Sequence, residues 1–235
     1  MISIIIPIFN QASKLRAVLE SLAAQSYQDF EVIIVNDGSK DNPEDVFTKY
    51  LRERQPKLSC LFLNQDNQGA PAARNRGFRS AKGEYLFFCD ADAVLAPEAL
   101  AKLLSALEAN SQASYAYSSF RWGRKLFRVG QCDPDRLRQG PCIHTMALIR
   151  RQDFPASGWD ESIKKLQDWD LWLSMLDAGK IGVFVPEVLF QVSPGGHISS
   201  WLPSFAYRFL PFLPAARKYR EAVSLVKQKH GLEGQ

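Results

Sequence analysis

The chain has 235 residues, of which 46% are hydrophobic and 23% are charged, as in an ordinary soluble globular protein of one large domain or two small ones. Its 29 basic and 25 acidic side chains give a net charge of +4, a balance that gives no reason to expect a nucleic acid partner. No uncharged apolar run reaches the roughly 20 residues that span a bilayer, and residues 1–7 lack the basic region of a signal peptide, so we expect a cytoplasmic protein.

The first elements are a buried strand and an amphipathic helix. Residues 2–6 form a β-branched apolar run, and Pro7 is expected to end it because proline cannot donate to a strand ladder. Asn10 is suited to cap the next helix. The apolar positions of that helix recur at helical spacing: Leu15, Val18, Leu19 and Leu22.

Strands and helices continue to alternate up to residue 110. Strands are predicted at 32–35, 58–63 and 84–89, and helices at 43–54, at 70–81 and from Pro97 onward. This alternation predicts an α/β fold with a mostly parallel sheet covered by helices on both faces. Such sheets bind ligands beyond the carboxyl ends of their strands, where the strand order reverses. Asp37 and the Asp90-Ala91-Asp92 segment both lie at such ends.

The second part of the chain has a different pattern. Strands are predicted at 114–120, 125–129 and 143–149, a helix from Asp168, and two short strands at 183–192 that are separated by Pro186. From Trp201 onward, aromatics, prolines and arginines are interleaved. This tail is either a helix packed on the domain or an interfacial membrane segment over residues 201–220.

The four cysteines, Cys60, Cys89, Cys132 and Cys142, form no C-x-x-C pair and no regular framework. We expect all four to be reduced thiols, as is usual in a cytoplasmic protein.

Two carboxylates separated by one residue follow the strand at 84–89. On an extended segment Asp90 and Asp92 would point the same way and offer hard oxygen ligands for Mg²⁺ or Mn²⁺. The alternative is a pair of turn carboxylates, one of which caps the following helix. Asp37 lies at another strand end, where it could accept an N–H from a nucleobase or form an Asx-turn.

Several motifs in order resemble the family-2 glycosyltransferases of the GT-A fold. They are residues 3–10 (SIIIPIFN), 35–39 (VNDGS), 67–69 (NQG), 73–77 (ARNRG), 83–85 (GEY) and 90–92 (DAD). The resemblance extends over residues 2–195. It implies an inverting transfer of a sugar from a nucleotide diphosphate donor, with a divalent Mn²⁺ or Mg²⁺ ion as cofactor.

The resemblance also implies a set of donor-binding residues: Pro7, Phe9, Asn10, Asp37, Arg74, Asp90, Ala91 and Asp92. Pro7, Phe9 and Asp37 would line the nucleoside pocket, with phenylalanine where tyrosine is more usual. Arg74 would lie near the diphosphate or the aspartate pair, although a surface position on its helix is the alternative. Asp92 would bind the metal, with Asp90 on the metal or the ribose.

On the acceptor side, the segment 165–173 (KLQDWDLWL) is similar to the motif that carries the general base. Asp168 would take the proton of the acceptor hydroxyl, although it could instead be a helix N-cap. Gln167 replaces the usual glutamate, which puts acceptor contacts in doubt. His197 would close over the diphosphate, complete the metal site or remain an exposed loop residue, and His144 is a candidate acceptor contact. Trp122, Trp159 and Trp169 are candidate stacking faces for a sugar, and Trp172 is assigned to the core.

The sequence therefore predicts one GT-A domain over residues 1–200, with a donor half at 1–110, an acceptor half at 111–200 and a helical extension at 201–235. We expect a UDP-sugar donor and a glycan or lipid-linked acceptor in cell-envelope polysaccharide synthesis, with peripheral contact at the inner face of the membrane. The alternatives are a non-catalytic nucleotide-sugar binding subunit and a nucleotidyltransferase, although residues 8–12 do not form the basic glycine-rich loop of the latter.

Overall fold

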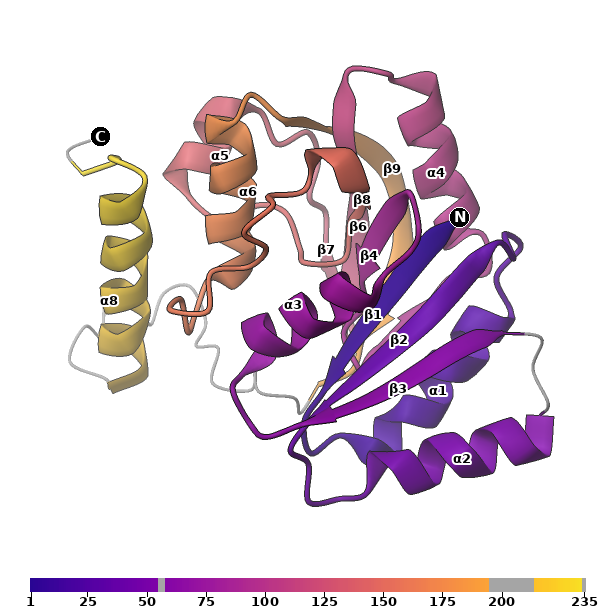
Figure 1. The fold of residues 1–235 in the computed structure, drawn as a ribbon. Helices are drawn as coiled ribbons and strands as arrows, with labels where there is room; N and C mark the ends of the chain where they lie inside the picture. Colours follow the sequence, from indigo (N-terminus) through magenta and orange to yellow (C-terminus); the bar gives the residue numbers. More distant parts are fainter. Residues whose placement is uncertain (55–57, 195–213, 234–235) are drawn as a thin grey trace.

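The computed structural model describes residues 1–54, 58–194 and 214–233, and they form an α/β fold around one mixed sheet (Figure 1). The strands are β1 (Ile2–Ile8), β2 (Phe30–Asp37), β3 (Ser59–Gln65), β4 (Tyr85–Phe88), β5 (Ala93–Leu95), β6 (Ala113–Trp122), β7 (Lys125–Phe127), β8 (Leu148–Arg150) and β9 (Ile181–Val192). The helices are α1 (Ala12–Ala23), α2 (Pro43–Arg54), α3 (Ala70–Ser80), α4 (Ala99–Ala109), α5 (Pro134–Gln139), α6 (Gln167–Asp177) and α8 (Pro214–Lys229).

The strand order of the sheet is β3-β2-β1-β4-β8-β6-β9-β5, with β7 paired to β6. The first four strands in this order are parallel. Beyond β4 the directions mix, because β8 is antiparallel to both β4 and β6 whereas β9 is parallel to β6. The chain places β2 and β3 on one side of β1 and then β4 on the other, so the strand order reverses between β1 and β4. The predicted ligand crevice belongs at the carboxyl ends of these two strands.

Two apolar clusters cover the two faces of the sheet. Ile4 and Ile6 of β1 pack with α1, α2 and α4, whereas Ile5 faces the opposite way toward α3 and α6. This division follows from the alternation of side chains along a strand. Figure 1 shows α3 across the near face of β1 and β2. The prediction of helices on both faces is confirmed.

The prediction that Pro7 ends the first strand is wrong, since β1 continues to Ile8. Pro7 is in register with Val35 of β2. On its other side β1 pairs with β4 only as far as Ile5, whose carbonyl accepts the Cys89 N–H. Alternate residues of a central strand bond to the same neighbour, so Pro7, like Ile5, faces the side of β4. Since β4 has already ended at this level, the missing N–H of Pro7 costs no hydrogen bond between strands.

Asn10 does not cap α1, because Gln11 occupies the cap position. Asn10 instead has a φ of 51°, and its Oδ1 accepts the Lys40 N–H at 2.9 Å. The N–H of Ala12 at the start of α1 donates to Asp41 Oδ2 at 2.7 Å. The turn after β2 therefore supplies the cap for α1, and this joins the ends of β1 and β2.

The segment predicted as two strands around Pro186 is the single strand β9. Its register against β6 shifts where Ser118 pairs with Val185 and Ser119 pairs with Val188. Pro186 lies in this irregularity, where its missing N–H breaks no regular ladder bond.

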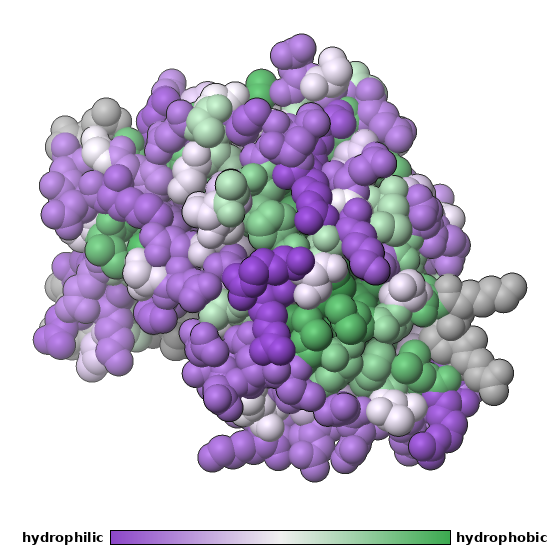
Figure 2. All heavy atoms as spheres, in the orientation of Figure 1, coloured by the Kyte–Doolittle hydropathy of each residue, from purple (hydrophilic) through white to green (hydrophobic). Residues whose placement is uncertain are grey.

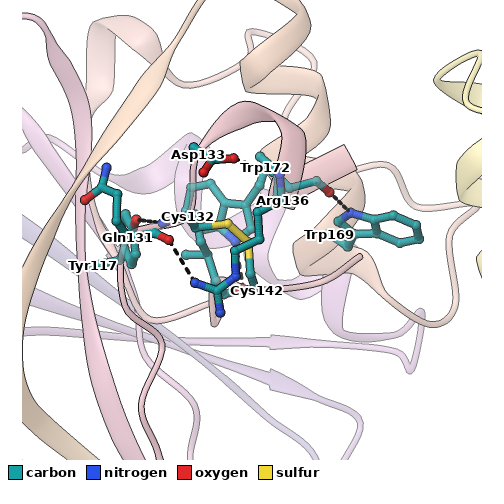
Figure 3. Close-up of a disulfide and its surroundings, with 10 residues drawn as sticks. Tyr117, Gln131, Cys132, Asp133, Arg136, Cys142, Trp169 and Trp172 are labelled. Atoms are coloured by element: carbon teal, nitrogen blue, oxygen red, sulfur yellow. Dashed lines mark hydrogen bonds between the residues drawn. A yellow bond between two sulfur atoms is a disulfide. The ribbon is translucent and has the colours of Figure 1, made fainter. Parts of the chain in front are cut away.

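Cys132 and Cys142 form a disulfide, so the prediction of reduced thiols is wrong for this pair, while Cys60 and Cys89 are free. The two Cα atoms are 6.3 Å apart, within the range that a disulfide bridges. The bridge encloses α5, and the Cys132 N–H donates to the Tyr117 hydroxyl at 2.7 Å (Figure 3). The chain turns back around α5 and so brings the two cysteines together. The spacing of the cysteines in the sequence does not predict this contact.

The helix α8 packs on the domain, as one of the two interpretations of the tail predicted. Val226 is fully buried in the apolar cluster that includes α6. Lys229 Nζ lies 2.7 Å from an Asp160 oxygen and 2.8 Å from an Asp170 oxygen. The stretch 201–213, where membrane contact was also predicted, lies outside the described residues. Within the described ranges, no helix is long and apolar enough to cross a bilayer.

One edge of the sheet is apolar and open in the part of the chain that the structure describes. Figure 2 shows a hydrophobic area where Figure 1 places β2 and β3. β3 is the last strand at this end of the sheet, and Leu61 in its centre is 42% exposed.

Candidate active site

Asp37 organises the loop at the end of β2 and is 3% exposed. Its Oδ1 accepts from the Gln65 side-chain amide at 2.8 Å and from the Gln68 N–H at 2.9 Å. Its Oδ2 accepts only from the Gly69 N–H, at 2.9 Å, among the residues described. Because each carboxylate oxygen has two lone pairs, Oδ2 can accept one further bond from a ligand. Gly38, with a φ of 74°, turns the chain directly after this carboxylate.

A polar hollow of about 490 Å³ adjoins Asp37. Its lining consists of Asn36, Asn64, Gln65, Asp66, Gln68 and Arg76. Two of these lining residues, Gln65 and Gln68, also hold the Asp37 carboxylate, so the hollow borders the loop around Asp37. Its volume is sufficient for a small planar ligand.

Asp90 and Asp92 follow β4 in a turn, which the Ala93 N–H closes by donating to the Asp90 carbonyl at 3.1 Å. The prediction that they lie on an extended segment is therefore wrong. Burial raises the pKa of Asp92, and the negative charge of Asp90 adds to this effect, whereas Lys14 opposes it. Since Asp92 is only 8% exposed, a cation at this corner would relieve both the repulsion and the cost of burial.

Arg74 of α3 connects the aspartate pair with the start of α6. It is 7% exposed, so the alternative of a surface arginine is wrong. One terminal nitrogen lies 3.4 Å from Asp90 Oδ1, and the other donates to Gln167 Oε1 at 2.9 Å. The guanidinium lies 4.7 Å from the centre of the Trp159 ring, a cation–π contact. Its Nε has no hydrogen-bond partner in the described chain, which leaves one donor unused.

Asn75, the next residue of α3, holds the loop that precedes α6. Its amide donates to the Trp159 carbonyl at 2.9 Å and to Glu161 Oε1 at 2.8 Å, and its Oδ1 accepts the Trp159 N–H at 2.7 Å. Gly158 has a φ of 74°, and a Cβ at this position would overlap the Asn75 carboxamide. Consecutive residues of α3 therefore position both the aspartate corner and the approach to α6.

Asp168 lies in the first turn of α6, and Leu166 occupies the N-cap, so the alternative role of Asp168 as the cap is wrong. Burial raises the pKa of Asp168 above its usual value. The charges of His144 and Arg74 act in the opposite direction, and the charge of Asp90 acts in the same direction as burial. Asp168 directly follows Gln167, which Arg74 connects to Asp90, so these groups act on it from the same corner. A raised pKa makes a carboxylate a better proton acceptor at neutral pH.

His144 lies beside Asp90, and its predicted contact with an acceptor stays a prediction. Its Nε2 is 3.7 Å from Asp90 Oδ2, and its ring centre is 4.6 Å from that of Phe120. Its Nδ1 accepts the Met146 N–H at 3.2 Å. When the ring is neutral, its proton therefore lies on Nε2, which faces Asp90.

Lys14 of α1 belongs to the same corner, although sequence reasoning missed it. Its Nζ lies 3.5 Å from Asp92 Oδ2. Ser21 lies two helical turns further along α1 and accepts the Leu95 N–H at 3.3 Å, which fixes α1 beside the segment after Asp92. A lysine in an amphipathic helix is not a recognisable signal, and only the packing of α1 on β5 reveals this contact.

The remaining predicted residues fall into three groups. Pro7, Phe9 and Asn10 lie at or just beyond the end of β1 and retain some exposure, and Ala91 is buried in the turn between the aspartates. Trp169 and Trp172 are fully buried, which confirms Trp172 as core and excludes Trp169 as a sugar-stacking face. His197 lies outside the described residues.

The aspartate corner fits a divalent ion that arrives with a phosphate ligand. Asp90 and Asp92 supply the hard oxygen atoms that Mg²⁺ and Mn²⁺ prefer. Within the described ranges, no group of three or more histidine, cysteine, aspartate or glutamate side chains is arranged to hold a metal. Ions of this type need only one or two carboxylates when substrate phosphates complete the coordination.

The chain is similar to known bacterial proteins over most of its length. The family model described as "Glycosyl transferase family 2" matches residues 3–156. An uncharacterized glycosyltransferase of Escherichia coli, YibD, is 42% identical over 158 residues, which are 64% of this chain and 45% of that protein. Another, from Haemophilus influenzae, is 29% identical over 189 residues, which are 75% of this chain and 62% of that protein. The chain thus spans about half to three fifths of these relatives.

Solved structures share the architecture. TarS 1–349 of S. aureus, in complex with UDP, has a TM-score of 0.70 at 17% identity, over 85% of this chain and 62% of that chain. The mannosyltransferase PcManGT from Pyrobaculum calidifontis, in complex with GDP-Man and Mn²⁺, has a TM-score of 0.70 at 17% identity, over all of this chain and 76% of that chain. At this identity the likeness confirms the predicted GT-A type of α/β fold.

Proposed function

Because the chain belongs to glycosyl transferase family 2, we propose that it transfers a sugar from a nucleotide diphosphate sugar to a hydroxyl of a glycan or lipid-linked acceptor, with inversion at the anomeric carbon. The observation that carries this proposal is the contact of Arg74 with both Asp90 and Gln167. Through it, the end of β4 meets the start of α6, where Asp168 lies. A donor-binding corner and a candidate base thus share one site.

On the donor side, Pro7, Phe9, Asn10 and Asp37 bind the nucleoside, with the available lone pair of Asp37 Oδ2 accepting a base N–H. We favour a UDP-sugar, and the similar TarS structure is a complex with UDP. The similar PcManGT structure is instead a complex with GDP-Man and Mn²⁺, so both nucleotides belong in the test.

Asp92 and Asp90 would hold the divalent ion, with His197 as the proposed third ligand. Bound there, the ion supplies a Lewis acid for the charge of the leaving diphosphate. Arg74 places a fixed positive charge near the same diphosphate. Ala91, which is buried between the two aspartates, would contribute its backbone to this corner.

Asp168 removes the proton of the acceptor hydroxyl as that oxygen attacks the anomeric carbon. Its raised pKa supports this role, because an aspartate with its ordinary pKa of about 3.9 is a weak base. Gln167 holds Arg74 and does not itself accept a proton. A place in cell-envelope glycan synthesis, with residues 201–220 against the membrane, remains a prediction.

The test combines nucleotide binding with transfer. In calorimetry, UDP or GDP should bind more tightly when Mn²⁺ is present, and metal-independent binding would contradict the role of Asp92. In a screen of nucleotide sugars scored by product mass, Asp168→Asn should lose about 10²- to 10⁴-fold in rate while nucleotide affinity stays unchanged. Asp135→Asn is the control, since that side chain is 88% exposed on α5. Transfer that survives in Asp168→Asn would place the base elsewhere, and nucleotide binding without any transfer would favour a non-catalytic subunit.

A further inference from the structure

A buried ammonium group with no well-formed hydrogen bond lies beside Asp92. Lys14 Nζ is inaccessible to solvent and has no hydrogen-bond partner in the described part of the chain. Its nearest charged neighbour is Asp92 Oδ2 at 3.5 Å, beyond the 2.7–2.9 Å that is usual for a charge-assisted hydrogen bond. An ammonium has three donors, and burying them unused costs free energy. The group can therefore donate hydrogen bonds to a ligand that brings acceptor atoms to this corner.

The position of Lys14 is fixed by the packing of α1. Lys14 and Ser21 lie seven residues apart on one face of this helix, and Gln25 follows the C-terminal end of the helix. Ser21 accepts the Leu95 N–H at 3.3 Å, and Gln25 Oε1 accepts the Leu100 N–H at 3.1 Å. The same helix face thus binds the segment that follows Asp92. The base of the Lys14 side chain is held there, while its four-carbon stem lets the ammonium move over a short range.

A second cation with an unused donor approaches from the other face of the sheet. Arg74 belongs to α3, which packs against the cluster around Ile5, whereas α1 packs against the cluster around Ile4. Arg74 contacts Asp90 at 3.4 Å, and its Nε has no partner among the residues described. Two cations with spare donors therefore bracket the aspartate turn from opposite sides. An anion between Lys14 and Arg74 could accept hydrogen bonds from both unused donors.

We propose that Lys14 binds the diphosphate of the nucleotide donor, opposite Arg74. This inference rests on the proposed function and adds a binding residue to it. The ammonium moves from Asp92 Oδ2 to a phosphate oxygen, and the same movement leaves Asp92 available to a metal ion. The competing role is that of a permanent counter-ion, in which Lys14 only neutralises Asp92 and touches no ligand.

The experiment measures binding of UDP, GDP, uridine and guanosine to the full chain by calorimetry, in EDTA and in Mn²⁺. Lys14→Met keeps the apolar stem and removes the charge. It should weaken binding of the nucleotide about tenfold, equivalent to about 1.4 kcal/mol, and leave the nucleoside unaffected. Lys14→Arg should recover most of the loss. Lys49→Met is the matched control, because the Lys49 side chain is 71% exposed on α2.

Three outcomes are decisive. A selective loss of diphosphate binding in Lys14→Met, with recovery in Lys14→Arg, supports the proposal. Unchanged nucleotide binding together with tighter binding of Mn²⁺ would overturn it in favour of the counter-ion role. Should the wild-type chain bind neither UDP nor GDP in either buffer, the proposed function itself fails. Thermal unfolding of each variant verifies that it is folded.

Discussion

Gln167 occupies the position where the resemblance leads one to expect glutamate, and it still binds Arg74. Its Oε1 accepts from Arg74 at 2.9 Å, and its Nε2 donates to the Lys164 carbonyl at 3.3 Å. Because an amide is neutral, it leaves the charge of Arg74 uncompensated from this side. That charge remains available to lower the pKa of Asp168 and so partly offsets the effect of burial.

Gln167→Glu is expected to raise the pKa of Asp168 further, since a new carboxylate disfavours the ionised form and pairs with Arg74. If Asp168 is the base, the acid limb of the pH profile of kcat/KM should move to higher pH. The measurement is the rate of transfer over a pH series, with the exposed Gln152→Glu as the control for an added charge. An acid limb that stays in place or moves to lower pH would separate Asp168 from the catalytic step.

The carboxylates of the site could be read from the sequence, but the cations around them could not. Asp37, Asp90 and Asp92 directly follow predicted strands, so a parallel sheet places them at one edge. Lys14 and His144 have no such marker, because their contacts depend on how α1 and the segment before β8 pack. The disposition of the aspartate pair was also beyond the sequence, since the turn after β4 is set by tertiary hydrogen bonds.

At the scale of elements, α8 is attached to α6 by a buried histidine. His230 Nδ1 lies 2.7 Å from Asp177 Oδ2, and its Nε2 lies 3.0 Å from Asp170 Oδ1. Burial alone would lower the pKa of His230, but the hydrogen bonds to the two aspartates outweigh it, and the pKa is raised. Lys229 reinforces the attachment, and its contact lowers the pKa of Asp160 to about 2.

This pairing predicts a pH-dependent contribution to stability. The stabilisation by protonated His230 is complete below the unfolded pKa of about 6.5 and is lost as the pH rises through the higher folded pKa. His230→Gln should therefore lower the free energy of unfolding by about 1–3 kcal/mol at pH 6, with a smaller difference at alkaline pH. Denaturant unfolding over a pH series measures this, with the exposed Gln228→Ala as control. A difference that does not change with pH would contradict the charged pair.

Local patterns predicted long elements well and proline-containing strands poorly. The helix predicted at 43–54 has the same bounds in the structure, because its proline, acidic first turn and basic last turn are all local signals. The predictions at Pro7 and Pro186 were wrong, since the effect of each proline depends on whether a neighbouring strand is present or the register is irregular. Short elements such as α5 and β5 lack any period of their own and were not predicted.

At the scale of the whole molecule, the open edge of the sheet at β3 predicts self-association. An edge strand offers unpaired backbone groups, and Leu61 adds an apolar side chain that is 42% exposed. We expect concentration-dependent association of the wild-type chain through this edge. Leu61→Lys should suppress it and change the free energy of unfolding by only about 0.5 kcal/mol.

Sedimentation velocity over a concentration series measures this association. Leu225→Lys is the matched control, because Leu225 is 48% exposed on α8, away from the sheet edge. Equal suppression by both variants would attribute the effect to net charge and not to β3.

The contacts of α3 also determine how this protein could be recombined with a relative. Across the boundary predicted near residue 110, the side chains of Arg74 and Asn75 hold Gln167 and the loop at Gly158, in addition to the strand pairs β4–β8 and β5–β9. A hybrid joined near residue 110 would take residues 74 and 75 from one protein and the segment 158–168 that they contact from another. We expect such a hybrid to keep its strands and still misplace Asp168, unless residues 74 and 75 are transplanted together with the segment 158–168.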